Sequence, residues 1–177
     1  MPAGLPSCSL RAKLKPRSRN RTTSRASSPS HDRSTSNLSR LAAGCTGSSG
    51  RLHVTPVIAA WHDGVLYFST GAGEQKARNL AHDGRCALTT GKNALTEGLD
   101  LVVEGRAEPV ADRALLEEGI AAYEAKYGPH MTSPEGTFHG IGETFRRGDA
   151  VVFAVAPATA YGFGGANGVY SHTRWAF

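Results

Sequence analysis

Long hydrophobic runs are absent from this sequence: its 177 residues contain no stretch of about 18 apolar residues, the length that a membrane-spanning helix requires. Cysteine is also scarce, and Cys8, Cys45 and Cys86 show neither metal-ligand spacing nor a pattern of disulfide pairing. We therefore expect no membrane partner, no metal site and a reducing, cytoplasmic environment.

Acidic residues are nearly missing from the first 40 positions, where Asp32 is the one carboxylate among nine Lys and Arg. The remaining residues hold 11 basic and 14 acidic side chains, so the net charge of +5 comes from the N-terminal segment. A nucleic-acid-binding domain would carry its basic residues on the fold itself. We expect no nucleic-acid partner for the folded part.

Residues 1–50 also have almost no aromatic or β-branched apolar side chains, and they are rich in Ser, Thr, Arg, Pro and Gly. Such a segment buries too little surface to offset its ordering entropy. We interpret it as a disordered basic extension before a folded domain at residues 51–177. Three roles stay open: a targeting peptide, a polycation that binds nucleic acid, or an extension without function.

The pattern changes after Arg51. Residues 52–61 form an apolar extended run, Asp63-Gly64 follows, and residues 65–68 form a second run, which together predict a β-hairpin. Further expected elements are helices at 74–82 and 112–125, strands at 86–90, 99–110 and 150–161, and a long loop at 128–149. Gly105 predicts a bend or bulge within its strand.

This order of elements contains hairpins without regular βαβ alternation, which favours a mainly β fold, an antiparallel β-barrel with peripheral helices. Residues 52–57, 66–71 and 74–80, taken in order, resemble the pyridoxamine 5′-phosphate oxidase-like superfamily. That superfamily has the FMN-binding split-barrel fold and includes FMN-dependent and deazaflavin (F420)-dependent reductases. The resemblance covers residues 51–177 and implies a homodimer with the cofactor in the interface.

The resemblance also implies a cofactor site. The strand from Thr55 would offer backbone groups to the isoalloxazine ring, hydroxyls at the end of the second run would bond the phosphate, and the helix start would complete the phosphate site. The implied cofactor-binding residues are Thr55, Pro56, Val57, Ser69, Thr70, Gln75, Lys76 and Asp100. His172 and Arg174 are candidates for the substrate side, and no side chain is expected to be an obligatory catalytic acid or base.

General physics supports the phosphate assignment independently. The glycine loop at residues 71–73 enters a helix, whose first N–H groups are unpaired and lie at the positive end of the helix dipole. Lys76 adds a compact positive charge in the first turn. The alternative is that Lys76 is a solvated helix residue and that the glycine loop is only a turn.

Three departures from the family pattern bear on function. Thr55 and Ala60 stand where the vitamin oxidases have an Arg and a Lys, which argues against oxidation of the vitamin itself. Glu74 would repel a phosphate unless its carboxylate turns toward Arg78. The family's first strand should precede Arg51, yet residues 41–47 make a poor strand.

We therefore expect an FMN-dependent oxidoreductase that acts on a small organic substrate. An F420-dependent reductase is the leading alternative, and a cofactor or heme carrier without turnover is the alternative of another class. An apolar face around Val57, Ala59 and Trp61 is expected to be covered by a second copy of the chain.

Overall fold

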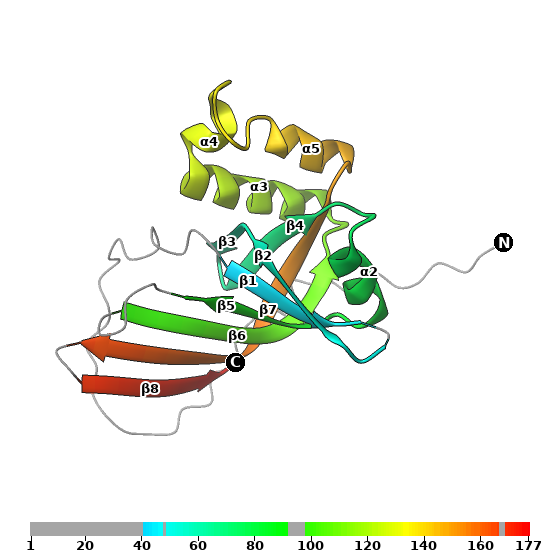
Figure 1. Ribbon diagram of the computed structural model, residues 1–177. Coiled ribbons are helices and arrows are strands. Elements are labelled where there is room, and N and C mark those ends of the chain that lie inside the picture. Colours follow the sequence, from blue (N-terminus) through cyan, green and yellow to red (C-terminus); the bar gives the residue numbers. More distant parts are fainter. Residues whose placement is uncertain (1–40, 48, 92–97, 167–168) are drawn as a thin grey trace.

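The computed structural model describes residues 41–47, 49–91, 98–166 and 169–177 (Figure 1). The expected disordered segment at 1–40 lies outside the described residues. The described elements, in chain order, are β1 (Leu41–Thr46), β2 (Leu52–Val57), β3 (Ala59–His62), β4 (Val65–Thr70), α2 (Gln75–His82), β5 (Arg85–Thr90), β6 (Gly98–Pro109), α3 (Arg113–Tyr127), α4 (Pro129–Thr132), α5 (Ile141–Arg147), β7 (Val151–Ala166) and β8 (Val169–Ala176).

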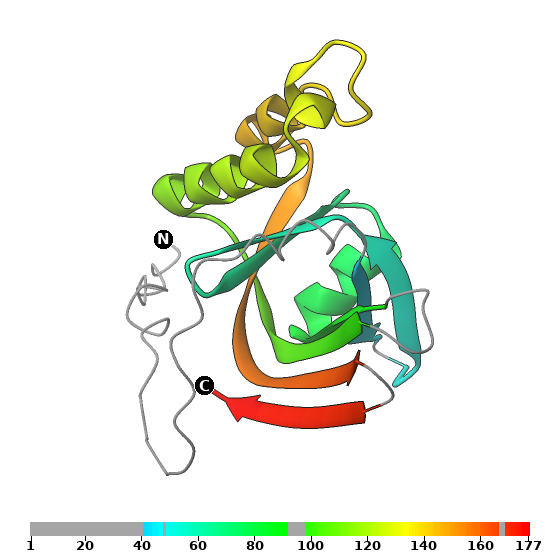
Figure 2. The same cartoon turned by 90° about the vertical axis from the view of Figure 1, so that its left-hand side faces the viewer.

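The strands form one antiparallel sheet in the order β2-β1-β5-β6-β7-β4-β3. Its two outermost strands, β2 and β3, are consecutive in the chain and are separated only by Ile58. A sheet whose two ends are joined by one residue must curl until those ends meet. Figure 2 shows this curl, with α3, α4 and α5 outside it.

β7 is long enough to pair with two different strands along one of its edges. Its first residues pair with β4, and its last residues pair with β8. Along its other edge it pairs with β6, where the register shifts between Glu104 and Gly105. A side chain at Gly105 would collide with the carbonyl oxygen of Ala156, so the bulge predicted at this glycine is confirmed.

The core has two layers, one on each side of β4. Leu66 and Phe68 face the inside of the curled sheet, together with buried residues of β1, β5, β7 and α2. Val65 and Tyr67 face the other way and pack against α3, α4 and α5. Alternate residues of one strand therefore serve different cores, as the two-residue period of a strand requires.

Several sequence expectations are confirmed locally. The hairpin turn has positive φ at Asp63 (43°) and Gly64 (81°), as a two-residue Asp-Gly loop requires. The side chain of Asp112 caps α3 by accepting from the backbone N–H of Leu115 at 2.9 Å.

Three expectations about elements were wrong. Residues 41–46 form a strand inserted between β2 and β5, so the fold extends at least to Leu41 rather than beginning at residue 51. The single strand expected at 52–61 is two strands at opposite ends of the sheet. The expected loop at 128–149 contains α4 and α5. Residues 169–176, for which no element was predicted, form β8.

The joint between β2 and β3 is held by side chains from α3. The Tyr127 hydroxyl donates to the carbonyl oxygen of Ala59 at 2.9 Å and accepts from its N–H at 3.1 Å. Tyr123 donates to the carbonyl oxygen of Ile58 at 2.8 Å, and Lys126 donates to that of Ala59 at 2.6 Å. Burial raises the pKa of both tyrosines and lowers the pKa of Lys126 to about 8.

We predict that Tyr127→Phe lowers the free energy of unfolding by about 1–3 kcal/mol, because it removes the bond to the buried N–H of Ala59 and one of the two side-chain bonds to its carbonyl oxygen. Denaturant unfolding followed by circular dichroism measures this. Tyr170→Phe removes the same hydroxyl from a residue that is 71% exposed and should change little. Equal effects of the two substitutions would mean that the joint does not depend on Tyr127.

Candidate functional site

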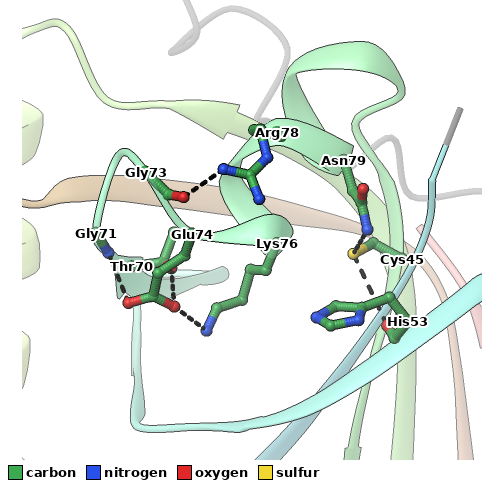
Figure 3. A network of polar contacts seen from close by, with 9 residues as sticks. All are labelled: Cys45, His53, Thr70, Gly71, Gly73, Glu74, Lys76, Arg78 and Asn79. Atoms are coloured by element: carbon green, nitrogen blue, oxygen red, sulfur yellow. Dashed lines mark hydrogen bonds and ion pairs between the residues drawn. The ribbon is translucent and has the colours of Figure 1, made fainter.

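The candidate site lies where β4 ends and α2 begins (Figure 3). There the loop of Gly71, Ala72 and Gly73 turns the chain from the last residue of the strand into the helix. Three donors of this segment meet at one point, and we call Thr70, Gly71 and Lys76 the anion corner. In this structure the group at their meeting point is the carboxylate of Glu74.

Both oxygens of that carboxylate are engaged. Oε2 accepts from the Thr70 hydroxyl at 2.8 Å and from the Lys76 ammonium at 3.0 Å. Oε1 accepts from the backbone N–H of Gly71 at 3.1 Å. These bonds, that of Thr70 first and those of Lys76 and Gly71 next, lower the pKa of Glu74 to about 2.

Lys76 is held firmly in this corner. Its side chain is only 11% exposed, whereas that of Glu74 is 55% exposed. A nearly buried ammonium needs a negative partner, since an unpaired charge out of water is costly. The interpretation of Lys76 as a solvated helix residue is therefore wrong.

Glu74 does not turn toward Arg78, which was the arrangement in which its carboxylate was expected not to repel a phosphate. The Arg78 guanidinium donates instead to the carbonyl oxygen of Gly73 and to the side-chain oxygen of Gln75. Gln75 in turn donates to Asn79 at 2.7 Å, so its side chain is engaged along the helix rather than in the corner.

Asn79 links the helix to the barrel, a contact that the sequence analysis missed. Its side-chain amide donates to the Cys45 sulfur at 3.8 Å, and Cys45 contacts the carbonyl oxygen of His53 at 3.8 Å (Figure 3). The available signal was the spacing of Gln75 and Asn79, which are one helical turn apart.

Ser69 and Thr70 point to opposite sides of β4. Thr70 shares its side with Phe68 of the inner core, and its hydroxyl reaches the corner. Ser69 shares its side with Tyr67, and its hydroxyl bonds with Tyr123 of α3. Of the two hydroxyls predicted for the phosphate site, the structure brings only that of Thr70 to the corner.

β2 carries the other predicted cofactor contacts. Thr55 and Val57 face inward, and Pro56 faces outward. The Thr55 hydroxyl oxygen is buried and has no hydrogen-bond partner among the described residues. β2 pairs with β1 along one edge, and no strand in the described part of the chain pairs with its other edge. Buried polar atoms normally have partners, so this strand suits a bound polar group.

The remaining predicted site residues lie elsewhere. Asp100 pairs with Phe163 near the start of β6, and Figure 1 shows that end of β6 away from α2. His172 stacks on Phe163 with ring centroids 5.1 Å apart, and Arg174 is exposed on β8. Within one chain, the structure does not bring these residues to the anion corner.

The described residues contain no group of three or more His, Cys, Asp or Glu side chains placed to hold a metal ion. In the same part of the chain, no helix combines the length and apolar character needed to cross a membrane.

The sequence model of pyridoxamine 5′-phosphate oxidase matches residues 35–163, well over half of the chain. The chain belongs to this family. No curated protein matches the sequence of this family member. The match confirms the resemblance inferred from the residues.

Solved structures show the same fold. A heme binding protein from Mycobacterium smegmatis superposes with a TM-score of 0.57 at 16% identity, covering 77% of this chain and 52% of that protein, so the chain spans about half its length. PhzG from Burkholderia lata, in complex with tetrahydrophenazine-1-carboxylic acid, gives 0.54 at 14% identity, covering 79% and 77%. An FAD-binding protein from Mesorhizobium loti gives 0.52 at 16%, covering 72% and 86%.

These likenesses to solved structures confirm the split-barrel fold of this pyridoxamine 5′-phosphate oxidase family member. They include proteins described by different ligands, so fold alone leaves the cofactor open. The site has to be judged from the anion corner and β2.

We predict that Thr70→Val raises the pKa of Glu74 from about 2 toward its ordinary value of 4.5, because it removes the hydrogen bond that contributes most to the lowered pKa. Carbon-detected NMR titration of the Glu74 carboxyl group measures this. A lowered pKa adds stability that is present above the ordinary pKa and is lost as the pH falls through the folded value. In Thr70→Val, this contribution should be smaller, and its loss should be complete at a higher pH.

Ser69→Ala is the matched control, because Ser69 lies on the other side of β4. It should leave the Glu74 titration where it is in the parent. An unchanged titration in Thr70→Val would contradict the hydrogen bond from Thr70.

Proposed function

We propose that the chain is an FMN-dependent oxidoreductase of the pyridoxamine 5′-phosphate oxidase family acting on a small organic substrate. The anion corner carries this proposal. A hydroxyl, a backbone N–H and a nearly buried ammonium converge on one anionic group, and the same donor set is complementary to the oxygens of a phosphate.

β2 supports the rest of the cofactor site. The unpaired edge of the strand offers backbone donors and acceptors, and the orphaned Thr55 hydroxyl offers one more polar contact. Pro56 lacks an N–H and sits on this edge, where no ladder bond is lost. The polar rim of a flavin ring has matching donors and acceptors.

The protein's part in the reaction is to bind and orient. FMN, when bound, supplies the hydride or electron transfer. Lys76 and Thr70 would hold its phosphate, and β2 would fix the edge of its ring. No side chain of this chain is assigned a proton-transfer step, since the residues at the corner serve anion binding.

The likeness to a heme binding protein favours a second candidate, a heme carrier without turnover. F420 is a third candidate, because it also carries a phosphate that the corner could hold. The absorbance spectrum of the purified protein separates the three, since flavin, F420 and heme differ in their visible bands. Reduction of a nicotinamide or dye acceptor then separates an enzyme from a carrier.

We predict that Lys76→Ala weakens FMN binding about 10- to 100-fold, because it removes a charge-assisted bond to the phosphate. Fluorescence titration with FMN and with riboflavin measures this, and riboflavin should bind parent and variant alike. Arg78→Ala is the matched control, because it removes a positive charge from an exposed position of the same helix. Equal losses for FMN and riboflavin would contradict a phosphate contact.

A homodimer remains a prediction, but the structure changes the surface through which we expect the two copies to meet. Val57 and Ala59, expected on the exposed apolar face, are 7% and 0% exposed and belong to the chain's own core. Large apolar side chains are exposed instead on one face of β6 and β8, beside Gly162 and Gly164 of β7: Leu99, Val169 and Trp175. We call these three the apolar patch, and we propose that a second copy covers it.

We predict that Val169→Asp shifts the protein from dimer to monomer, because it places a charge within the apolar patch. Light scattering after size-exclusion chromatography measures the mass. Ala121→Asp adds the same charge on the exposed side of α3 and should leave the dimer intact. A monomeric parent, or a Val169→Asp variant that stays a dimer, would contradict this interface.

A further inference from the structure

We infer that Glu74 is an internal ligand of the anion corner and sets its selectivity, reducing the advantage that a phosphate group gives to a cofactor bound there. This inference rests on the proposed flavin site. It follows from the occupancy of the corner: each donor predicted for a cofactor phosphate already has the Glu74 carboxylate as its partner.

The carboxylate fills the corner in both charge and geometry. Its oxygens share the bonds from Thr70, Gly71 and Lys76 at 2.8 to 3.1 Å, and its charge neutralises the ammonium. An entering phosphate therefore finds no donor without a partner among Thr70, Gly71 and Lys76. It has to replace an anion that is covalently attached to the same loop.

Glu74 is nevertheless free to leave. Its side chain is 55% exposed, and although it occupies the N-cap position of α2, it makes no capping bond to the helix. The side-chain hydrogen bonds that Glu74 makes within the described residues all go to the corner. Rotation of the side chain into solvent would break these bonds without moving the backbone, whereas Lys76 would stay where it is.

A displaced carboxylate still weakens phosphate binding. It remains one residue before the helix begins, close to a dianionic phosphate, and like charges at short range repel. Riboflavin has no phosphate and leaves Glu74 in place. We therefore expect the parent to favour FMN over riboflavin by much less than the lysine and the helix N-terminus would give without Glu74.

The test is Glu74→Ser, measured by fluorescence titration with both flavins. Serine removes the charge and is favoured at an N-cap. FMN affinity should rise at least about tenfold through the freed charge-assisted bonds, and riboflavin affinity should stay within about twofold of the parent, since riboflavin makes no phosphate contact. Glu135→Ser, which removes a carboxylate from the exposed segment between α4 and α5, should change neither.

A second readout does not involve flavin. Inorganic phosphate should raise the melting temperature of Glu74→Ser, because the freed corner binds it and ligands of the native state stabilise it. The parent and the double variant Glu74→Ser with Lys76→Ala should show no such rise. Glu74→Gln, which keeps the shape and loses the charge, replaces Glu74→Ser in both measurements if the serine variant does not fold.

The outcomes separate the two proposals. Equal FMN affinity in parent and Glu74→Ser, with no stabilisation by phosphate, overturns the role of Glu74. Stabilisation of Glu74→Ser by phosphate, with no binding of either flavin to any variant, supports the role of Glu74 and overturns the flavin assignment.

Discussion

The hydrogen bonds from α3 to Ile58 and Ala59 hold the joint on which the barrel depends. β2 and β3 stand at opposite ends of the sheet order, and only Ile58 separates them in the chain. Tyr123, Lys126 and Tyr127 bind the backbone of this joint from outside the sheet. A helix therefore fixes the place where the sheet turns from one edge to the other, and it also covers the outer core.

The joint determines where the two parts of the candidate site, β2 and the end of β4, lie. β2 leaves the joint with one edge unpaired, and β4, which pairs with β3, ends in Thr70 at the anion corner. α2 then packs its Leu80 into the inner core, so the helix start has a fixed position. Two features of the candidate site, a free strand edge and a cationic corner, are thus held by one curled sheet.

Glu74 supplies the anion corner with a ligand from the chain itself. The same donors that favour a phosphate also favour a carboxylate, because both are oxygen anions. With the carboxylate supplied by the chain, Lys76 is neutralised without any ligand, which explains how an ammonium with an 11% exposed side chain is tolerated. The fold of the family and the proposed selectivity of the anion corner are therefore separate properties of this chain.

Local sequence patterns determined much of this protein. Asp63-Gly64 specified its turn, Asp112 its helix cap, Gly105 its bulge, and the glycine loop before Lys76 an anion-binding corner, because each depends on a few neighbouring residues.

Only the tertiary structure decided the rest. The weakly patterned residues of β1 form a strand because β2 and β5 pair with them on both sides. Ser69 points away from the corner because β4 separates two cores and Ser69 is on the side of the outer one. Glu74 turned to Lys76 rather than Arg78 because the loop brought Thr70 and Gly71 to the same point, and such convergence depends on the folded path of the chain rather than on spacing along it.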